Sequence, residues 1–440
     1  MTIKAHRLII AAIALLALTP LHAEEGGSYS AYTPYSVFGA GQLLGGGSAY
    51  NMTMGGAGIA SRNHRYINLL NPAAVTARDT LAFMSDFSVY ENNKMLKQSG
   101  RSSANNIFNI NDFVISFPLF YSNVADISAM VGIKPYSSTG YSYGYYESDP
   151  STLASLGNVA HAYTGQGSIY QVFGTLGAEL FDKVSVGAEG IYYFGNIKRK
   201  YTQSIEDKAA LALSKTTDMS LSAASARFGV QYEQPIGDKL TLGVGAVYTL
   251  KSNLHGFIEQ SSVIGEHTDT QIDTLGVTTS EVYLAGEAGI GFSIAYGNKF
   301  RASLDYTRAD WSRSGFENVS GFAVDAVGGD FRSNVAQSVR AGVEYIPNPS
   351  DIRYYHKLIA YRAGVYFNKE YFSVAGHDIY SRGITLGATL PVFRWSNGLT
   401  LGMELGKRGS LQDNLIEETY VNFSLGINLF DIWFQQRRYE

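Results

Sequence analysis

Residues 421–429 read VNFSLGINL, and this stretch decides the fold class. Its odd positions are all large and apolar, whereas its even positions are Asn, Ser, Gly and Asn. Such strict alternation is typical of a β-strand with one apolar and one polar face. A strand of a soluble sandwich can alternate as well, but it seldom keeps its inward set polar or tiny while its other face is so apolar. The stretch therefore favours a transmembrane β-barrel, in which every second side chain faces lipid.

The same pattern recurs along the chain, for example in Leu240–Leu250 (LTLGVGAVYTL) and Ile384–Val392 (ITLGATLPV). It predicts fourteen strands, an even number as expected for a bacterial single-chain barrel. We place them near residues 80–90, 112–121, 126–141, 167–181, 183–200, 218–233, 239–253, 281–296, 299–308, 335–346, 357–368, 382–392, 398–408 and 418–431. The fold class that follows is all-β, a 14-stranded antiparallel transmembrane β-barrel.

The connections between these strands alternate in length. Those after the even-numbered strands are mostly short, including the PNPSD turn at residues 347–351. Those after the odd-numbered strands are mostly longer and polar, including Asn92–Asn111, Ser142–Gln166 and Ser252–Ser280. Short periplasmic turns and longer outer loops are typical of outer-membrane barrels. We therefore expect the outer membrane of a Gram-negative bacterium, with both termini in the periplasm.

Composition and the first residues agree with a secreted membrane protein. Of 440 residues 16% are charged, against about 25% in soluble domains. There is no cysteine, which excludes disulfides, thiolate metal sites and lipoprotein-type lipidation, and the net charge of −4 gives no reason to expect nucleic acid. Lys4 and Arg7 precede the apolar run Leu8–Leu18, so residues 1–23 read as a signal peptide. A membrane anchor would need about 20 apolar residues.

Residues 24–79 precede the first strand and are rich in Tyr and Gly. Such a segment is too apolar to stay in the periplasm and too rich in glycine to form its own core. We expect it to fold into the lumen of the barrel (residues 80–440) as a hatch. A short turn started by Pro72 at Asn71–Val75 would then lead the chain to the wall.

Two motifs of this segment resemble a known family. Met54-Gly55-Gly56-Ala57-Gly58 and Asn71-Pro72-Ala73 look like the hatch of long-chain fatty acid transporter (FadL-type) outer-membrane proteins. Two longer stretches of sequence resemble the branch of that family found in Bacteroidota: SYSAYTPYSVFGAGQL and MGGAGIASRNHRYINLLNPAA. The resemblance implies a hatch motif of Gly55, Gly56, Gly58, Asn71, Pro72 and Ala73. It also implies a hydrophobic ligand that leaves sideways through a wall opening, although some members of this branch are accessory barrels of protein-export or barrel-assembly machines.

Strand parity places ten charged residues toward the lumen. They are Glu179, Glu189, Arg227, Glu287, Arg301, Asp305, Arg340, Glu344, Arg362 and Glu404. Because an unpaired ion deprived of water is costly, we expect opposite charges to pair with one another and to anchor the plug. The alternative is that some of them form a polar track for the head group of a ligand.

No pattern of catalytic or metal-binding residues is present in the sequence. There is no G-x-S-x-G elbow and no local Ser–His–acid set, so we predict no catalytic residue and no enzyme. The eight histidines lack ligand spacing, and Gly55–Gly58 is not preceded by a strand, so we predict neither a metal nor a nucleotide cofactor.

Two functions remain open. The first is binding or passage of hydrophobic small molecules across the outer membrane, which we rank ahead because it is the usual role in the family. The second is a non-transporting accessory barrel, a protein–protein scaffold of an export or barrel-assembly complex. The expected partners are outer-membrane lipid, a hydrophobic ligand and envelope-complex proteins. The outer loops are mainly Ser, Asn, Thr, Gln and charged residues, which weakens the case for lipid capture.

Overall fold

The computed structural model describes residues 31–78, 82–122, 124–205, 212–265, 267–275, 282–319, 321–323, 330–392 and 398–432. The predicted signal peptide, residues 1–23, lies outside the described residues. Among the described residues, no helix is long and apolar enough to cross a membrane.

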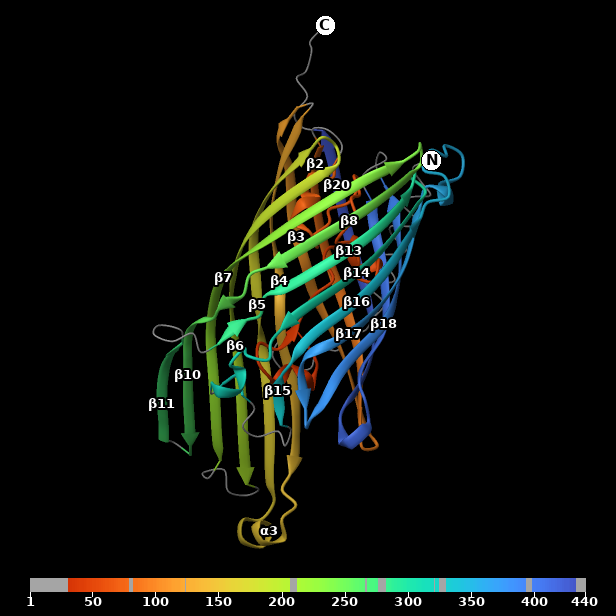
Figure 1. Ribbon diagram of the computed structural model, residues 1–440. Coiled ribbons are helices and arrows are strands. Elements are labelled where there is room, and N and C mark those ends of the chain that lie inside the picture. The colour runs from red at the N-terminus through yellow and green to blue at the C-terminus, as the bar shows by residue number, and fades with distance from the viewer. Residues whose placement is uncertain are drawn as a thin grey trace.

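The described chain forms a closed antiparallel barrel of fourteen strands, as the alternation predicts (Figure 1). Closure is made by β2 and β20, which pair from Ala82↔Ile432 to Lys97↔Glu417. The wall consists of β2 (Ala82–Gln98), β3 (Arg101–Tyr121), β4 (Ala125–Tyr146), β5 (Val159–Leu180), β6 (Val184–Ile205), β7 (Leu213–Ile236), β8 (Leu240–Thr249), β13 (Glu287–Tyr296), β14 (Phe300–Asp310), β16 (Val335–Tyr345), β17 (Ala360–Val374), β18 (His377–Pro391), β19 (Gly398–Gly409) and β20 (Glu417–Ile432).

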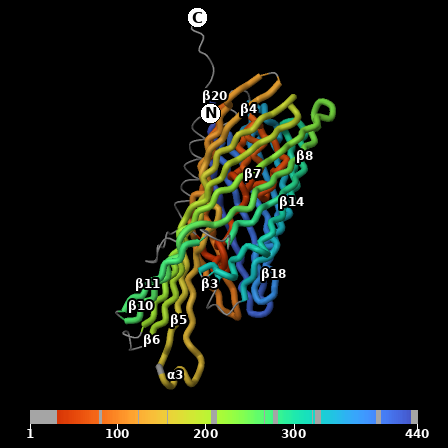
Figure 2. Tube along the Cα trace, turned by 60° about the vertical axis from the view of Figure 1, so that its left-hand side comes forward, coloured from red at the N-terminus to blue at the C-terminus, as the bar shows by residue number. Residues whose placement is uncertain are grey.

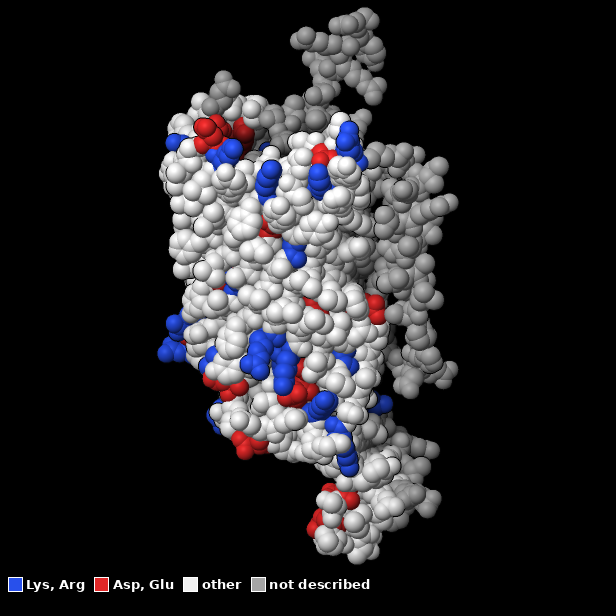
Figure 3. All heavy atoms as spheres, turned by 90° about the vertical axis from the view of Figure 1, so that its right-hand side faces the viewer, with Lys and Arg blue, Asp and Glu red and all other residues white. Residues whose placement is uncertain are grey.

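Apolar side chains on alternate strand positions cover the outside of the wall. On β20, Phe423, Ile427 and Leu429 are exposed, whereas Asn428 between them is buried in the lumen. Figure 3 shows the result on one face: a band with few charged side chains lies between two more highly charged ends. This is the surface that a barrel needs in lipid, because charge on the lipid face is costly.

The predicted long polar loops are largely strand. β2 and β3 continue to a turn at Ser99-Gly100, and β4 and β5 continue to the helix α3 (Pro150–Leu156). The region predicted as the loop Ser252–Ser280 contains the hairpin of β10 (His255–Ile264) and β11 (His267–Leu275), together with the short strand β9 (Ser252–Asn253), which pairs with β12 (Tyr283–Leu284). Period-two alternation is weak in polar, Ser- and Thr-rich sequence, so the sequence predicts loops where the strands continue.

One connection is longer than the short turn that the sequence predicts. The PNPSD turn belongs to a 14-residue connection at residues 346–359, which contains the 3-10 helix η5 (Tyr355–Lys357). Asp351 organises it, accepting hydrogen bonds from the backbone N–H groups of Arg353 (2.9 Å) and Tyr354 (2.7 Å). These Asx-type contacts cannot be read from strand parity.

The segment before β2 lies inside the barrel, where Figure 2 shows its red trace enclosed by the strands. It consists of short elements only: η1 (Pro34–Val37), β1 (Gln42–Leu43), α2 (Ala49–Thr53) and η2 (Pro72–Thr76). As predicted, η2 begins with Pro72, and the Asn71 side chain caps it by accepting a hydrogen bond from Ala73 N (3.0 Å). Most of the segment is buried.

An aromatic cluster packs around this segment at the end of the barrel where β15 lies (Figure 1). Phe38 contacts Tyr371 and Phe331 (β15, Phe331–Ser333) in stacked geometry, and Phe316 (η4, Phe316–Asn318) edge-on. The Tyr371 hydroxyl donates to the backbone carbonyls of Phe38 (3.0 Å) and Gly41 (2.6 Å). The segment therefore belongs to the same hydrophobic core as the strands.

Candidate functional site in the lumen

The glycine motif of the N-terminal segment lies directly against the barrel wall. A Cβ atom added to Gly364 of β17 would lie 2.2 Å from Gly55 N, and one added to Gly342 of β16 would lie 2.3 Å from Met54 O. Gly55 itself has a φ of +71°, which a side chain would strain. Glycine is therefore required on both sides of this contact, and backbone packs on backbone with no room for a ligand.

The rest of the motif is fixed by a carboxylate of the wall. Asp305 Oδ2 on β14 accepts hydrogen bonds from Gly58 N (2.6 Å) and Ile59 N (2.9 Å). The Gly55 N–H donates to Thr385 Oγ1 on β18 (2.9 Å). These bonds satisfy backbone donors that would otherwise be buried without partners.

Arg362 of β17 joins the wall to the segment through an ion pair and two cation–π contacts. Its Nε donates to Glu344 Oε2 on β16 (2.7 Å), and its guanidinium lies 4.8 Å from the ring centroid of Tyr50 and 4.5 Å from that of Tyr66. Glu344 Oε1 in turn accepts a hydrogen bond from Asn63 Nδ2 (3.2 Å). A buried ion pair thus holds two tyrosines and an asparagine of the segment together.

The opposite side of the segment is held by Arg62, which reaches β5. Its Nη2 lies 2.6 Å from Glu179 Oε2, and its Nη1 donates to Gln231 Oε1 on β7 (3.2 Å). Next to it, η2 packs on Gly187 and Gly229, where an added Cβ would lie 2.4 Å from the Pro72 carbonyl carbon and 2.0 Å from Asn71 Oδ1. Wall glycines again mark the path of the segment.

Three more predicted charges complete these contacts. Arg301 Nη1 donates to the Arg62 carbonyl (2.5 Å), and Arg227 Nη1 lies 3.3 Å from Glu189 Oε1. Arg227 also approaches the Leu69 carbonyl (3.5 Å). Arg340 also lies against the segment, since a Cβ added to Gly56 would lie 2.5 Å from its Nη1. Eight of the ten predicted lumen charges therefore either touch the segment or pair beside it: Glu179, Glu189, Arg227, Arg301, Asp305, Arg340, Glu344 and Arg362.

The wall is interrupted between β3 and β4. Their ladder runs from Tyr121↔Asp126 only to Phe113↔Ile133, and beyond it β3 pairs with β2 and β4 pairs with β5. The N-terminal segment occupies the freed edge of β4: β1 pairs there through Gln42↔Ser138 and Leu43↔Ser137.

Further hydrogen bonds join the segment to both sides of this break. Thr33 N donates to the Gly140 carbonyl and Leu44 N to the Tyr136 carbonyl, each at 2.8 Å. On the β3 side, Asn111 Nδ2 donates to the Gly47 carbonyl (3.2 Å). A short stretch of the segment therefore closes the break in the barrel wall.

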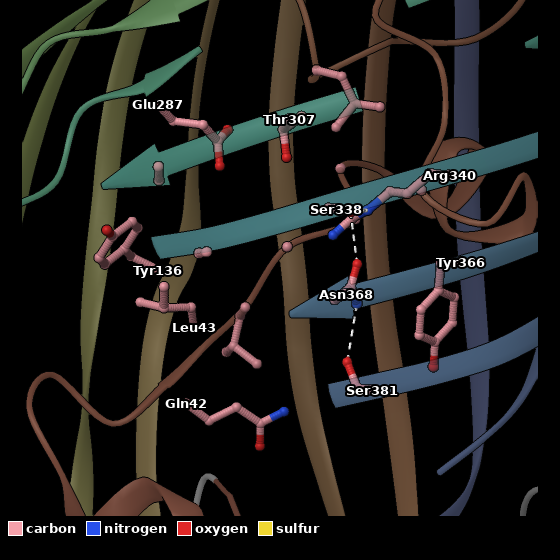
Figure 4. A pocket seen from close by; sticks show the side chains of 18 of the residues that line it. Gln42, Leu43, Tyr136, Glu287, Thr307, Ser338, Arg340, Tyr366, Asn368 and Ser381 are labelled. Atoms are coloured by element: carbon pink, nitrogen blue, oxygen red, sulfur yellow. Dashed lines mark hydrogen bonds between the residues drawn. The ribbon is translucent and has the colours of Figure 1, made fainter. Parts of the chain in front are cut away.

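Behind the break is a cavity of about 360 Å³. Residues of the break line it together with five of the predicted charges, Arg227, Glu287, Asp305, Arg340 and Glu404. Figure 4 shows Gln42, Leu43 and Tyr136 on one side of it and Arg340 on the other, at the start of a hydrogen-bonded row that continues through Ser338, Asn368 and Ser381. Apolar lining comes from Leu43, Leu44, Tyr193, Leu250, Leu284 and Trp311.

The sequence prediction does not include four cations that line this cavity: Lys94, Lys134, Lys369 and Arg408. Lys94 of β2 donates to Gln42 Oε1 (3.1 Å) and lies 3.7 Å from Glu418 Oε2, whereas Lys134 of β4 lines the cavity without a described carboxylate within 4.0 Å. The sequence pattern ends the first strand near residue 90 and so places Lys94 in a loop, whereas β2 continues to Gln98. Lys134 has the same inward parity as Ser128 and Met130, so strand parity is sufficient to predict that it faces the lumen.

Among the described residues, no group of three His, Asp or Glu side chains could hold a metal ion. The described side chains of the lumen provide ion pairs, hydrogen bonds and apolar contacts.

Comparison with known proteins gives a family and a fold. A model of the family BamG matches residues 3–440. No curated protein matches the sequence. Among solved structures, the Ralstonia pickettii toluene transporter TbuX is similar at 15% identity and a TM-score of 0.57, covering 88% of this chain and 98% of its own.

Two further solved structures share the fold. The Pseudomonas putida toluene transporter TodX is 12% identical with a TM-score of 0.57, covering 90% of this chain and 100% of its own. A Pseudomonas aeruginosa FadL homologue is 10% identical with a TM-score of 0.55, covering 89% and 99%. The predicted FadL-type barrel fold is therefore confirmed; the assignment to a Bacteroidota branch stays a prediction.

Proposed function

The chain belongs to the BamG family, and we propose that it binds and passes small hydrophobic molecules carrying one anionic group through the β3–β4 break of an outer-membrane barrel. The observation that carries this proposal is the break itself, closed by residues 33–47 and backed by a cavity. The cavity volume of about 360 Å³ suits a small ligand, since ligand pockets are commonly about 300–1,000 Å³.

The anionic group is inferred from the charges at the cavity. Neither Lys134 nor Arg340 has a described carboxylate within 4.0 Å, although both line the cavity. Leucine side chains at positions 43, 250 and 284 line the same space and would contact an apolar tail. In this proposal Glu404 takes no part, because Tyr366 Oη (2.5 Å) and Asn422 Nδ2 (2.9 Å) already donate to it.

Binding of decanoate to the full chain in nanodiscs tests the proposal. We expect saturable binding at least about tenfold tighter for decanoate than for decyltrimethylammonium, because a cation would face Lys134 and Arg340. Lys134→Met with Arg340→Met should abolish this preference, whereas the control Lys239→Met, in a turn outside the cavity, should keep it. Absence of saturable decanoate binding, or an unchanged preference in the double variant, would refute the proposed ligand class.

We propose that the short turns and both termini face the periplasm, and that α3 faces outward. Epitope tags inserted at Ser99-Gly100 should be reached by antibody on intact cells, because this turn is at the α3 end. A tag inserted at Gly237-Asp238 should not be labelled by antibody on intact cells. Labelling in the reverse pattern would invert the orientation.

A second candidate function is a non-transporting accessory barrel in an outer-membrane protein-export or barrel-assembly complex. The observation that favours it is the glycine contact of Met54 and Gly55 with β16 and β17, which leaves no space for a ligand between the segment and these two strands. Purification in mild detergent, followed by mass spectrometry of lipids and proteins, separates the two functions. Stoichiometric protein partners without enriched amphiphile would favour the scaffold, and the reverse would favour passage.

A further inference from the structure

The hairpin of β10 and β11 leaves the barrel wall. β7 pairs with β8 through Arg227–Ile236, but farther along, at Leu213–Ser222, it pairs with β10 instead. β10 then carries β11, which lies at the outer edge of the sheet in Figures 1 and 2. The barrel thus extends on one side into an open sheet, and β11 is its last strand.

The outer edge of β11 is unusually suited to pair with another strand. β11 is nine residues long and keeps an unbroken register with β10 from Ile264↔His267 to Gly256↔Leu275, and no described strand pairs with its other edge. Residues 267–274 are all exposed. Edge strands are normally blunted by charged side chains, proline, a bulge or short length. β11 has no proline and no bulge, and its only acidic side chains are Asp269 and Asp273.

The two faces of β11 differ in chemistry. Asp269, Gln271 and Asp273 lie on one face, and no described cation lies within 4.0 Å of either carboxylate. Thr270, Ile272 and Thr274 lie on the other, where Ile272 is 62% exposed and Phe257 of β10, opposite Thr274, is 57% exposed. A complementary strand would alternate basic and apolar side chains.

Charge argues against a second copy of this chain as the occupant. If two β11 strands paired antiparallel about Gln271, Asp269 of each would lie opposite Asp273 of the other. Like charges directly opposite each other destabilise a strand pair. The edge therefore favours a different partner.

We propose that the edge of β11 binds an extended segment of another protein, with alternating basic and apolar residues, by β-strand addition. Main-chain hydrogen bonds would provide affinity, and Asp269 and Asp273 would select the basic side chains. This interaction is independent of small-molecule passage and stands if the decanoate experiment fails.

Defined peptides test the proposal on the full chain in zwitterionic nanodiscs, measured by fluorescence anisotropy. We expect a nine-residue peptide of alternating Lys and Val to bind at least tenfold more tightly than its Glu/Val counterpart. Proline at its central position should weaken binding at least tenfold, because proline cannot donate to a ladder. Equal binding of the proline peptide would show that no strand is added and would overturn the proposal.

Charge reversal locates the site. Asp269→Lys with Asp273→Lys should invert the preference toward the Glu/Val peptide, whereas the control Asp182→Lys with Asp238→Lys, in turns at the other end of the barrel, should leave it unchanged. Thr270→Pro should reduce binding of both peptides without changing charge. The proposal would be overturned if the preference for the Lys/Val peptide survived charge reversal, or if the wild type bound both charged peptides equally. A β11-dependent dimer in sedimentation would overturn it as well.

Discussion

The N-terminal segment meets the barrel wall in two different ways. Against β14, β16 and β17 it packs backbone on glycine and is fixed by the buried groups Asp305, Glu344 and Arg362. At the β3–β4 break it pairs through the two residues of β1, and a cavity lies behind it. Moving the first contact would expose a buried ion pair, whereas moving the second breaks a few exchangeable hydrogen bonds. Moving the segment away from the wall should therefore cost less free energy at the β3–β4 break than at β14, β16 and β17.

The largest effect should come from breaking the fixed contact at Arg362. Arg362→Met leaves Glu344 buried without its cation, and we expect a loss of about 3–5 kcal/mol of unfolding free energy. Reversible refolding titrations in lipid would measure it. The double variant Arg362→Met with Glu344→Gln should recover part of the loss, because no charge is then left unpaired. Equal losses in both variants would mean that the ion pair is not what fixes the segment.

A smaller loss should follow from crowding the glycine contact. Gly364→Val places a side chain against Gly55 and should cost about 1–3 kcal/mol, the usual range for overpacking. It should also raise ion conductance in planar bilayers by displacing the segment. The matched control is Gly190→Val, at a strand position with nothing within 4 Å of an added Cβ. If the two variants had the same unfolding free energy and the same conductance, the contact between Gly364 and Gly55 would not be what fixes the segment.

The smallest effect on stability is expected at the break. Gln42→Ala removes the hydrogen bond that Lys94 Nζ donates to Gln42 Oε1, and Lys94 keeps Glu418 beside it. We expect a cost of about 1.5 kcal/mol, the lower end of the range for a hydrogen bond to a charged group. Decanoate should nevertheless associate faster with this variant, as stopped-flow fluorescence would reveal. If Gln42→Ala destabilised the barrel as much as Arg362→Met, the two regions would not differ as described.

Strand alternation could predict the barrel because lipid imposes period two on every spanning strand. It placed all fourteen strands and gave the inward parity of Glu344, Arg362 and Asp305. The partners of these groups could not be predicted: Asp305 binds backbone N–H groups, and backbone donors carry no sequence signal. The β3–β4 break could not be predicted either, because pairing between strands depends on their register. In addition, the Ser- and Thr-rich extensions of β4 to β7 weaken the alternation from which strand ends are predicted.

A cross-link across the break tests the central claim most directly. Leu43 and Ser137 are directly paired, and the chain has no cysteine, so Leu43→Cys with Ser137→Cys offers a single disulfide within reach of strand-pair geometry. The measurement is decanoate uptake by intact cells that carry the double variant, compared between the oxidised and reduced states. If the β1 stretch gates the break, oxidation should lower protein-dependent uptake at least about tenfold, and reduction should restore it. Equal uptake in both states would contradict the gate.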